Sequence, residues 1–149
     1  SLFENGIDRD DLENIIGKCI ELKKEYVEKD VYDQHIRKML NLGHTIGNAI
    51  EAASGYSISH GDAVASGIVA MGQIFDTPCV QRLKDTFENC GFDMADIDFT
   101  AEELAPYAAA DKKKGGDFVV IVIPRDIGVC ELERLPIDEI ESKLEKVCI

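Results

Sequence analysis

His44 and His60 are two of the three histidines in the chain, and both lie in the apolar, glycine-rich segment of residues 38–67. Imidazole nitrogens bind zinc and similar ions, and a catalytic zinc usually has three protein ligands and an open position. The two histidines are too far apart for the i, i+4 pair of a single zinc helix, so as ligands they must come from two helices. The spacing leaves two interpretations open, a shared metal site or a pair of structural or capping histidines.

A polar stripe accompanies the first of these histidines. Its residues follow an i, i+4, i+7, i+11 spacing, which places them on one side of a predicted helix: Arg37, Asn41, His44 and Asn48. An unpartnered buried polar group costs about 1–3 kcal/mol, so the stripe faces either water or a polar site. Directional donors and acceptors, in place of lysine and glutamate, favour a polyhydroxylated or phosphorylated ligand whose anionic group Arg37 would bind.

Lysines at two other places in the chain are either solvent-exposed or candidates for ligand binding. Lys112, Lys113 and Lys114 precede two glycines in an acidic chain. They form either a solvated loop or a place where one lysine folds back on a bound phosphate or carboxylate. Lys23 lies close to the apolar stripe of a predicted helix, where its long side chain would reach out to water. His35 is interpreted as a surface histidine without a role.

Apolar periodicity predicts a mainly α-helical domain with one small β-hairpin. The expected helices span residues 8–30, 34–53, 60–75, 79–90, 100–110 and 137–147, and Asp8 would be the first N-cap. Strands 118–123 and 129–132 would be joined by a turn at residues 124–128. The chain contains no repeat, low-complexity segment or interdomain linker, so residues 1–149 are expected to form one domain.

Two glycines in the predicted helix 34–53 indicate a close approach of another element. Gly43 and Gly47 each lower the stability of a helix by about 1 kcal/mol relative to alanine. Such a loss is tolerated where another backbone or a ligand comes near. The helix of residues 60–75 is apolar nearly all round, so we expect it in the centre of the domain. Ser59 or His60 would lie at its N-terminus, where backbone N–H groups favour anions.

Composition excludes several classes of function. The net charge of −13 argues against a general nucleic-acid binder and against binding to anionic membranes. Five cysteines without a CxxC pair indicate a reducing compartment, and therefore a cytoplasmic location. We expect no signal peptide and no membrane span, because no apolar run is long enough.

Three stretches of the chain resemble the 3-dehydroquinate synthase family, which belongs to the sugar phosphate cyclases. They are IRKMLNLGHTIGNAIE, HGDAVASG and the later DKKKGG with FVVIVIPRDIG, and the resemblance extends over residues 8–149. It implies the C-terminal half of a two-domain fold, with the active site between the domains. The N-terminal domain, which binds NAD, is absent from this chain.

The resemblance also implies a set of site residues. His44 and His60 match the metal ligands for zinc or another divalent ion, and the third ligand, a glutamate, would lie upstream of Ser1. Lys23, Arg37 and Asn41 match substrate-contacting positions. Asn48 and Lys112 match catalytic positions, and Lys112 is the phosphate-side lysine of the DKK motif, with Lys113 as the alternative.

The activity implied by the family is an NAD- and metal-dependent elimination of phosphate followed by ring closure, a carbon–oxygen lyase reaction. Its anionic substrate, 3-deoxy-D-arabino-heptulosonate 7-phosphate, becomes 3-dehydroquinate in the shikimate pathway of aromatic amino acid biosynthesis. We expect the isolated chain to be inactive, because the NAD-binding domain and the third metal ligand are missing. A homodimer is left open.

The chain departs from the family pattern at a few positions. Asn48 stands where the family motif GHTxGHA has a second histidine, and asparagine cannot exchange a proton near neutral pH. Val31 and Asp33 replace members of an acidic group, and Asp62 replaces a glutamate. Two alternatives therefore stand beside the first hypothesis, a domain of another sugar phosphate cyclase and a non-catalytic helical module.

Overall fold

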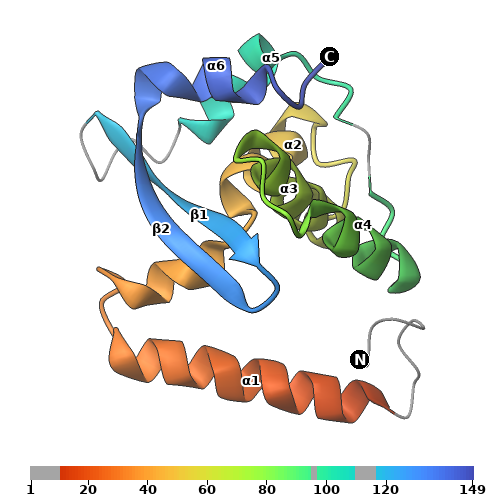
Figure 1. Cartoon of the computed structure of the whole chain (residues 1–149), viewed down its shortest axis with the longest axis vertical. Helices are drawn as coiled ribbons and strands as arrows, with labels where there is room; N and C mark the ends of the chain where they lie inside the picture. Colours follow the sequence, from red (N-terminus) through yellow and green to blue (C-terminus); the bar gives the residue numbers. More distant parts are fainter. Residues whose placement is uncertain (1–10, 95–96, 110–116) are drawn as a thin grey trace.

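The structure, a computed structural model, describes residues 11–94, 97–109 and 117–149. Figure 1 shows helices gathered around a two-stranded hairpin, which confirms the predicted mainly helical domain. In chain order the elements are α1 (Leu12–Lys29), the 3-10 helix η2 (Ile36–Asn41), α2 (His44–Ala53), α3 (His60–Ile74), α4 (Val80–Asn89), α5 (Ala101–Ala108), β1 (Phe118–Asp126), β2 (Val129–Pro136), the 3-10 helix η4 (Ile137–Glu139) and α6 (Ile140–Leu144).

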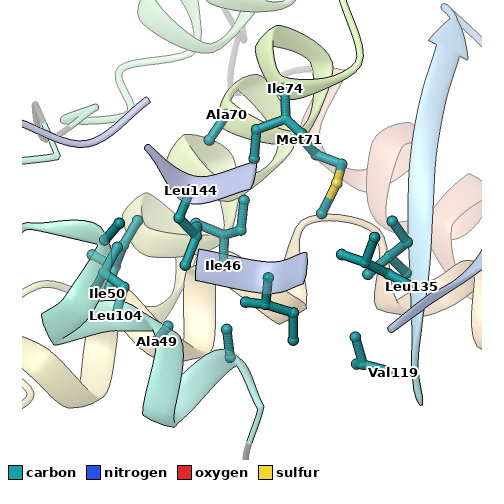
Figure 2. Close-up of a cluster of buried hydrophobic side chains, with 14 of the residues drawn as sticks. Ile46, Ala49, Ile50, Ala70, Met71, Ile74, Leu104, Val119, Leu135 and Leu144 are labelled. Carbon is teal, nitrogen blue, oxygen red and sulfur yellow. The ribbon is translucent and has the colours of Figure 1, made fainter. Parts of the chain in front are cut away.

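The hydrophobic core lies between α2, α3, α5, α6 and the hairpin. Helix α3 is its centre, with nine buried residues along its length, as its apolar sequence predicts. Ile46 from α2, Met71 from α3 and Leu144 from α6 extend into one cluster, shown in Figure 2. The core therefore holds α2 and α3 rigidly against each other, and both candidate metal ligands are carried by these two helices.

The hairpin is longer than the sequence predicts. β1 and β2 pair antiparallel from Phe118 opposite Pro136 to Asp126 opposite Val129. Pro124, expected in the turn, lies instead within β1, where the register shifts between Pro124 and Asp126. A proline lacks a backbone donor and is tolerated at such an irregularity. The tight turn is then left to Ile127 and Gly128, and Gly128 has a positive φ of 79°.

The prediction of one continuous helix over residues 34–53 is wrong. The segment is divided into η2 and α2, and Gly43 between them adopts a left-handed conformation with φ of 76°. A Cβ atom on Gly43 would approach the Val64 carbonyl oxygen of α3 to 2.6 Å. Because α3 occupies that space, the chain turns at Gly43, and the polar stripe does not lie on one helix.

Other helix ends differ by smaller amounts. Asp11 is the N-cap of α1, and the expected cap Asp8 lies outside the described residues. Helix α5 ends at Ala108, short of the predicted residue 110. The last predicted helix, 137–147, is instead the 3-10 helix η4 followed by the short helix α6. After α6 the chain turns, and the Leu144 carbonyl oxygen accepts hydrogen bonds from the Val147 and Cys148 N–H groups. No helix in residues 11–94, 97–109 and 117–149 has the length and apolar character to span a bilayer.

Asp30 fixes the loop that leads into η2. The residue is 9% exposed, and its carboxylate accepts hydrogen bonds from the backbone N–H groups of Gln34, His35 and Arg37 at 3.0, 2.6 and 3.2 Å. The bond from Gln34, followed by those from His35 and Arg37, lowers the pKa of Asp30 against the opposing effect of desolvation. The ionised carboxylate therefore stabilises the fold.

We expect Asp30→Ala to lower the melting temperature by several degrees at pH 7, because three backbone donors lose their acceptor. A group with a lowered folded pKa stabilises above its unfolded pKa, and this contribution disappears as pH falls through the folded pKa. The difference from the unsubstituted chain should therefore shrink below about pH 4. Thermal denaturation followed by circular dichroism at pH 7 and pH 3 measures both effects. Equal melting temperatures at pH 7 would contradict the assignment.

Candidate functional site

His44 and His60 meet at the N-terminal ends of two neighbouring helices. Each is the first residue of its helix, α2 for His44 and α3 for His60. The ring centroids lie 5.4 Å apart, with an angle of 63° between the ring planes. Ser59 caps α3 through its hydroxyl, which accepts from the Asp62 N–H at 3.2 Å. The two imidazoles therefore converge from separate helices.

Both rings are held by their Nδ1 atoms. His44 Nδ1 lies 3.1 Å from the Leu42 carbonyl oxygen, and His60 Nδ1 lies 3.0 Å from Glu51 Oε2. Both oxygens are acceptors, so each Nδ1 carries the proton that it donates. In the neutral imidazoles both Nε2 atoms then keep a free lone pair, as in histidine ligands oriented by a carbonyl or carboxylate.

Close packing of α2 on α3 brings the rings together. A Cβ atom on Gly67 of α3 would collide with the Gly43 carbonyl oxygen and would lie 2.7 Å from the Gly47 nitrogen. A Cβ atom on Gly47 would lie 2.9 Å from the Val64 Cα atom. Real Cβ atoms do not approach a backbone so closely. The expectation that another backbone comes near Gly43 and Gly47 is therefore confirmed.

A cavity of about 420 Å³ opens beside His44. Asn41, His44 and Asn48 line it together with Thr45, Ala52, Tyr107, Ala108, Val119 and Val120. Its walls thus come from η2, α2, α5 and β1, and the Asn41, His44 and Asn48 side chains belong to η2 and α2. This volume lies within the range of small-molecule sites, and the lining is polar and apolar in similar measure.

Of the remaining candidates, those that the structure describes do not line this cavity. Arg37 donates from Nη1 to the Val31 carbonyl oxygen at 3.0 Å and does not line the cavity in the described part of the chain. Lys23 is exposed on α1. Lys112 and Lys113 lie outside the described residues. His35 is exposed, as expected of a surface histidine.

Two residues of the site were not predicted from the sequence. Glu51, which orients His60, follows His44 by seven positions and so lies on the same face of α2, a spacing that could have identified it. Tyr107 lines the cavity because α5 packs on α2. No local pattern around Tyr107 signals that contact.

Imidazole nitrogens are common metal ligands, so the histidine pair could provide two ligands for a metal ion. Within the described ranges, no group of three or more His, Cys, Asp and Glu side chains is arranged to hold one. Glu51 does not act as a third ligand in this geometry, since its carboxylate accepts from the Nδ1 side of His60. The donors that are present, two Nε2 lone pairs, suit zinc or another borderline divalent ion.

Comparison with known sequences gives consistent matches. The family described as 3-dehydroquinate synthase C-terminal matches residues 2–114. The 3-dehydroquinate synthase of Dictyoglomus thermophilum is 36% identical over 143 residues, which cover 91% of this chain and 39% of that protein. The enzyme of Clostridium kluyveri is 32% identical over 151 residues, which cover 94% of this chain and 42% of that protein. The chain therefore spans about two fifths of the length of these curated relatives.

Comparison with solved structures supports the fold. A crystal structure of 2-deoxy-scyllo-inosose synthase complexed with carbaglucose-6-phosphate, NAD+ and Co2+ has a TM-score of 0.70 and 20% identity, covering 93% of this chain and 41% of that one. A second structure of 2-deoxy-scyllo-inosose synthase has a TM-score of 0.73 and 22% identity, and the match covers 94% of this chain and 41% of that one. At this identity the likeness concerns the fold.

Proposed function

Because the chain belongs to the 3-dehydroquinate synthase C-terminal family, we propose that residues 1–149 are the metal- and substrate-binding domain of a two-domain enzyme. An N-terminal NAD-binding domain of the same polypeptide completes it. The relatives' greater length supports this arrangement, since the chain covers 39% of the Dictyoglomus thermophilum protein. A cytoplasmic location and a homodimer remain predictions.

The proposed reaction converts 3-deoxy-D-arabino-heptulosonate 7-phosphate into 3-dehydroquinate and phosphate. The relatives at 36% and 32% identity are 3-dehydroquinate synthases, which supports this substrate over other sugar phosphates. The cavity beside His44 is large enough for a small polyhydroxylated ligand. In the shikimate pathway the product leads towards the aromatic amino acids.

The convergence of His44 and His60, with both Nδ1 atoms engaged, is the observation that carries the proposal. Their Nε2 atoms would hold zinc or another divalent ion, together with a glutamate from the segment before Ser1. A bound ion of this kind supplies Lewis acidity to a hydroxyl or carbonyl oxygen. The related synthase complex with NAD+ and Co2+ supports a divalent ion and NAD in this enzyme as well.

The other polar residues would bind and orient the substrate. Asn41 and Asn48 line the cavity on the same side as His44, so their amides are placed to hydrogen-bond substrate hydroxyls. Arg37 and Lys112 would bind anionic groups, and Lys23 and Lys113 would assist. The Arg37 guanidinium must leave the Val31 carbonyl to do so, a single exchange of an exposed hydrogen bond.

A phosphate-release assay tests the proposal. We expect the full-length protein with NAD and Zn2+ to release phosphate from the heptulosonate phosphate, and the 149-residue chain alone to release none. Turnover by the isolated chain would contradict the two-domain assignment. Turnover of no sugar phosphate by the full-length protein would favour a non-catalytic helical module.

Asn48 favours one alternative, a cyclase that acts on a different sugar phosphate. It lines the cavity at the position where the family motif has histidine, and its amide cannot transfer a proton near neutral pH. An assay of the full-length protein on a panel of sugar phosphates separates the two functions. Preferred turnover of a substrate other than the heptulosonate phosphate would replace the first proposal.

A further inference from the structure

Helix α1 presents an apolar face that nothing in the described chain covers. None of the residues of α1, which the structure describes in full, is buried. Leu12, Ile16 and Ile20 are 45%, 50% and 62% exposed, and Cys19 between them is also exposed. Their i, i+4, i+7, i+8 spacing places the four on one side of the helix, here called the α1 apolar face.

The position of α1 explains why this face is open. The helix runs along one edge of the molecule in Figure 1, and its main packing contact is with η2. Most helical stability in proteins comes from packing of the apolar face and not from intrinsic propensity. An uncovered stripe of isoleucine and leucine on such a helix indicates a docking surface.

We propose that the α1 apolar face binds the part of the same polypeptide that precedes Ser1. This inference rests on the proposed function, because it takes the two-domain protein as given. The chain covers only 39% and 42% of two relatives, and the matching family is a C-terminal one, so most of the relatives' remaining length precedes the matched region. Helix α1 is the first element that the structure describes and is therefore the one nearest to that segment in sequence.

A second copy of the chain fits the face less well. The helix has 18 residues and is about 27 Å long, so a stripe about 10 Å wide offers roughly 270 Å² per partner. Stable interfaces between separate proteins bury about 800 Å² per partner. A covalently attached segment needs less area, because its effective concentration is high without any association step. The small face therefore favours an intramolecular occupant.

Cys19 serves as a built-in reporter of this docking. It is exposed in the chain, whereas Cys79 is 3% exposed and provides an internal reference for buried thiols. We expect maleimide labelling of Cys19, followed by peptide mass spectrometry, to be at least about tenfold slower in the full-length protein than in the 149-residue chain. Equal labelling rates in the two proteins would overturn the proposal.

A matched pair of variants tests the face itself. Ile16→Glu places a charge on the α1 apolar face, and Asn14→Glu places the same charge on the opposite, solvent-facing side. In the full-length protein Ile16→Glu should restore fast Cys19 labelling and lower the melting temperature, while Asn14→Glu should do neither. In the 149-residue chain both variants should melt like the unsubstituted chain, because Ile16 is already half exposed there.

The outcomes separate this inference from the proposed function. An enzyme that turns over no sugar phosphate but protects Cys19 would keep the docking and overturn the reaction. An active enzyme in which Cys19 is labelled as fast as in the 149-residue chain would keep the reaction and overturn the docking. Protection of Cys19 in the isolated chain, with a dimer detected by light scattering, would overturn the proposal in favour of a second copy.

Discussion

Replacing His60 with alanine in the full-length protein should lower its affinity for Zn2+ on the order of 10²–10³-fold, and His44→Ala should do the same. Zinc binding by four protein ligands provides about 10–16 kcal/mol, so the loss of one ligand costs about 2.5–4 kcal/mol. The two ring centroids lie 5.4 Å apart and each Nδ1 already has a partner, so the proposed site uses both Nε2 atoms and the two effects should be similar. Competition of the metal against a chelator of known affinity measures the change, and phosphate release should fall with it.

Two further variants calibrate this result. His35→Ala should leave the metal affinity unchanged, because His35 is exposed and makes no contact with the pair in the described structure. Glu51→Gln keeps the shape of the residue that orients His60 but removes its charge, so the affinity should fall by about 10–100-fold. A His60→Ala protein that binds zinc as tightly as the unsubstituted one would contradict the metal assignment.

Gly67→Ala should destabilise the chain by about 1–3 kcal/mol or more, the range for overpacking a core. The new methyl group would meet the carbonyl oxygen of Gly43 and the nitrogen of Gly47, and a backbone cannot avoid it by a change of rotamer. Relief requires α2 and α3 to separate, which also moves His44 away from His60. Urea denaturation measures the stability, and a parallel metal titration should show weaker binding.

Gly17→Ala is the matched control for this substitution. Gly17 lies within α1, and among the described residues no atom comes within 4 Å of the position of its missing Cβ. Alanine there should therefore stabilise the helix, by roughly 0.5–1 kcal/mol. Opposite signs for Gly17→Ala and Gly67→Ala would confirm that close helix packing causes the loss. A Gly67→Ala chain of unchanged stability would exclude the proposed close contact.

Sequence patterns predicted most of the elements correctly and singled out the two histidines that the structure brings together. The apolar sequence of α3 correctly places it in the core, and Gly43 and Gly47 correctly indicate a close neighbour. The error at residues 34–53 arises from the same glycines. A helical spacing through Gly43 looks continuous in sequence, while contact with Val64 and the anchoring of the preceding loop by Asp30 divide the helix in space.

The cavity was only partly predictable. Asn41, His44 and Asn48 line it although they belong to two elements, because η2 and α2 meet at the turn and keep these side chains on a common side. Tyr107 and the β1 residues reach the same space through packing between segments distant in sequence. Such contacts depend on how α5 and the hairpin cover α2, and no local periodicity encodes that arrangement.

Titration of the 15N-labelled 149-residue chain with Zn2+, followed through the imidazole nitrogens by NMR, tests the central claim most directly. In the neutral imidazoles of the free chain, Nδ1 should carry the proton and Nε2 the lone pair in both His44 and His60. Added zinc should shift both Nε2 resonances over the same range of metal concentration and leave those of His35 unchanged. A shift of only one of the pair, or an equal shift of His35, would show that the two rings do not form a common metal site.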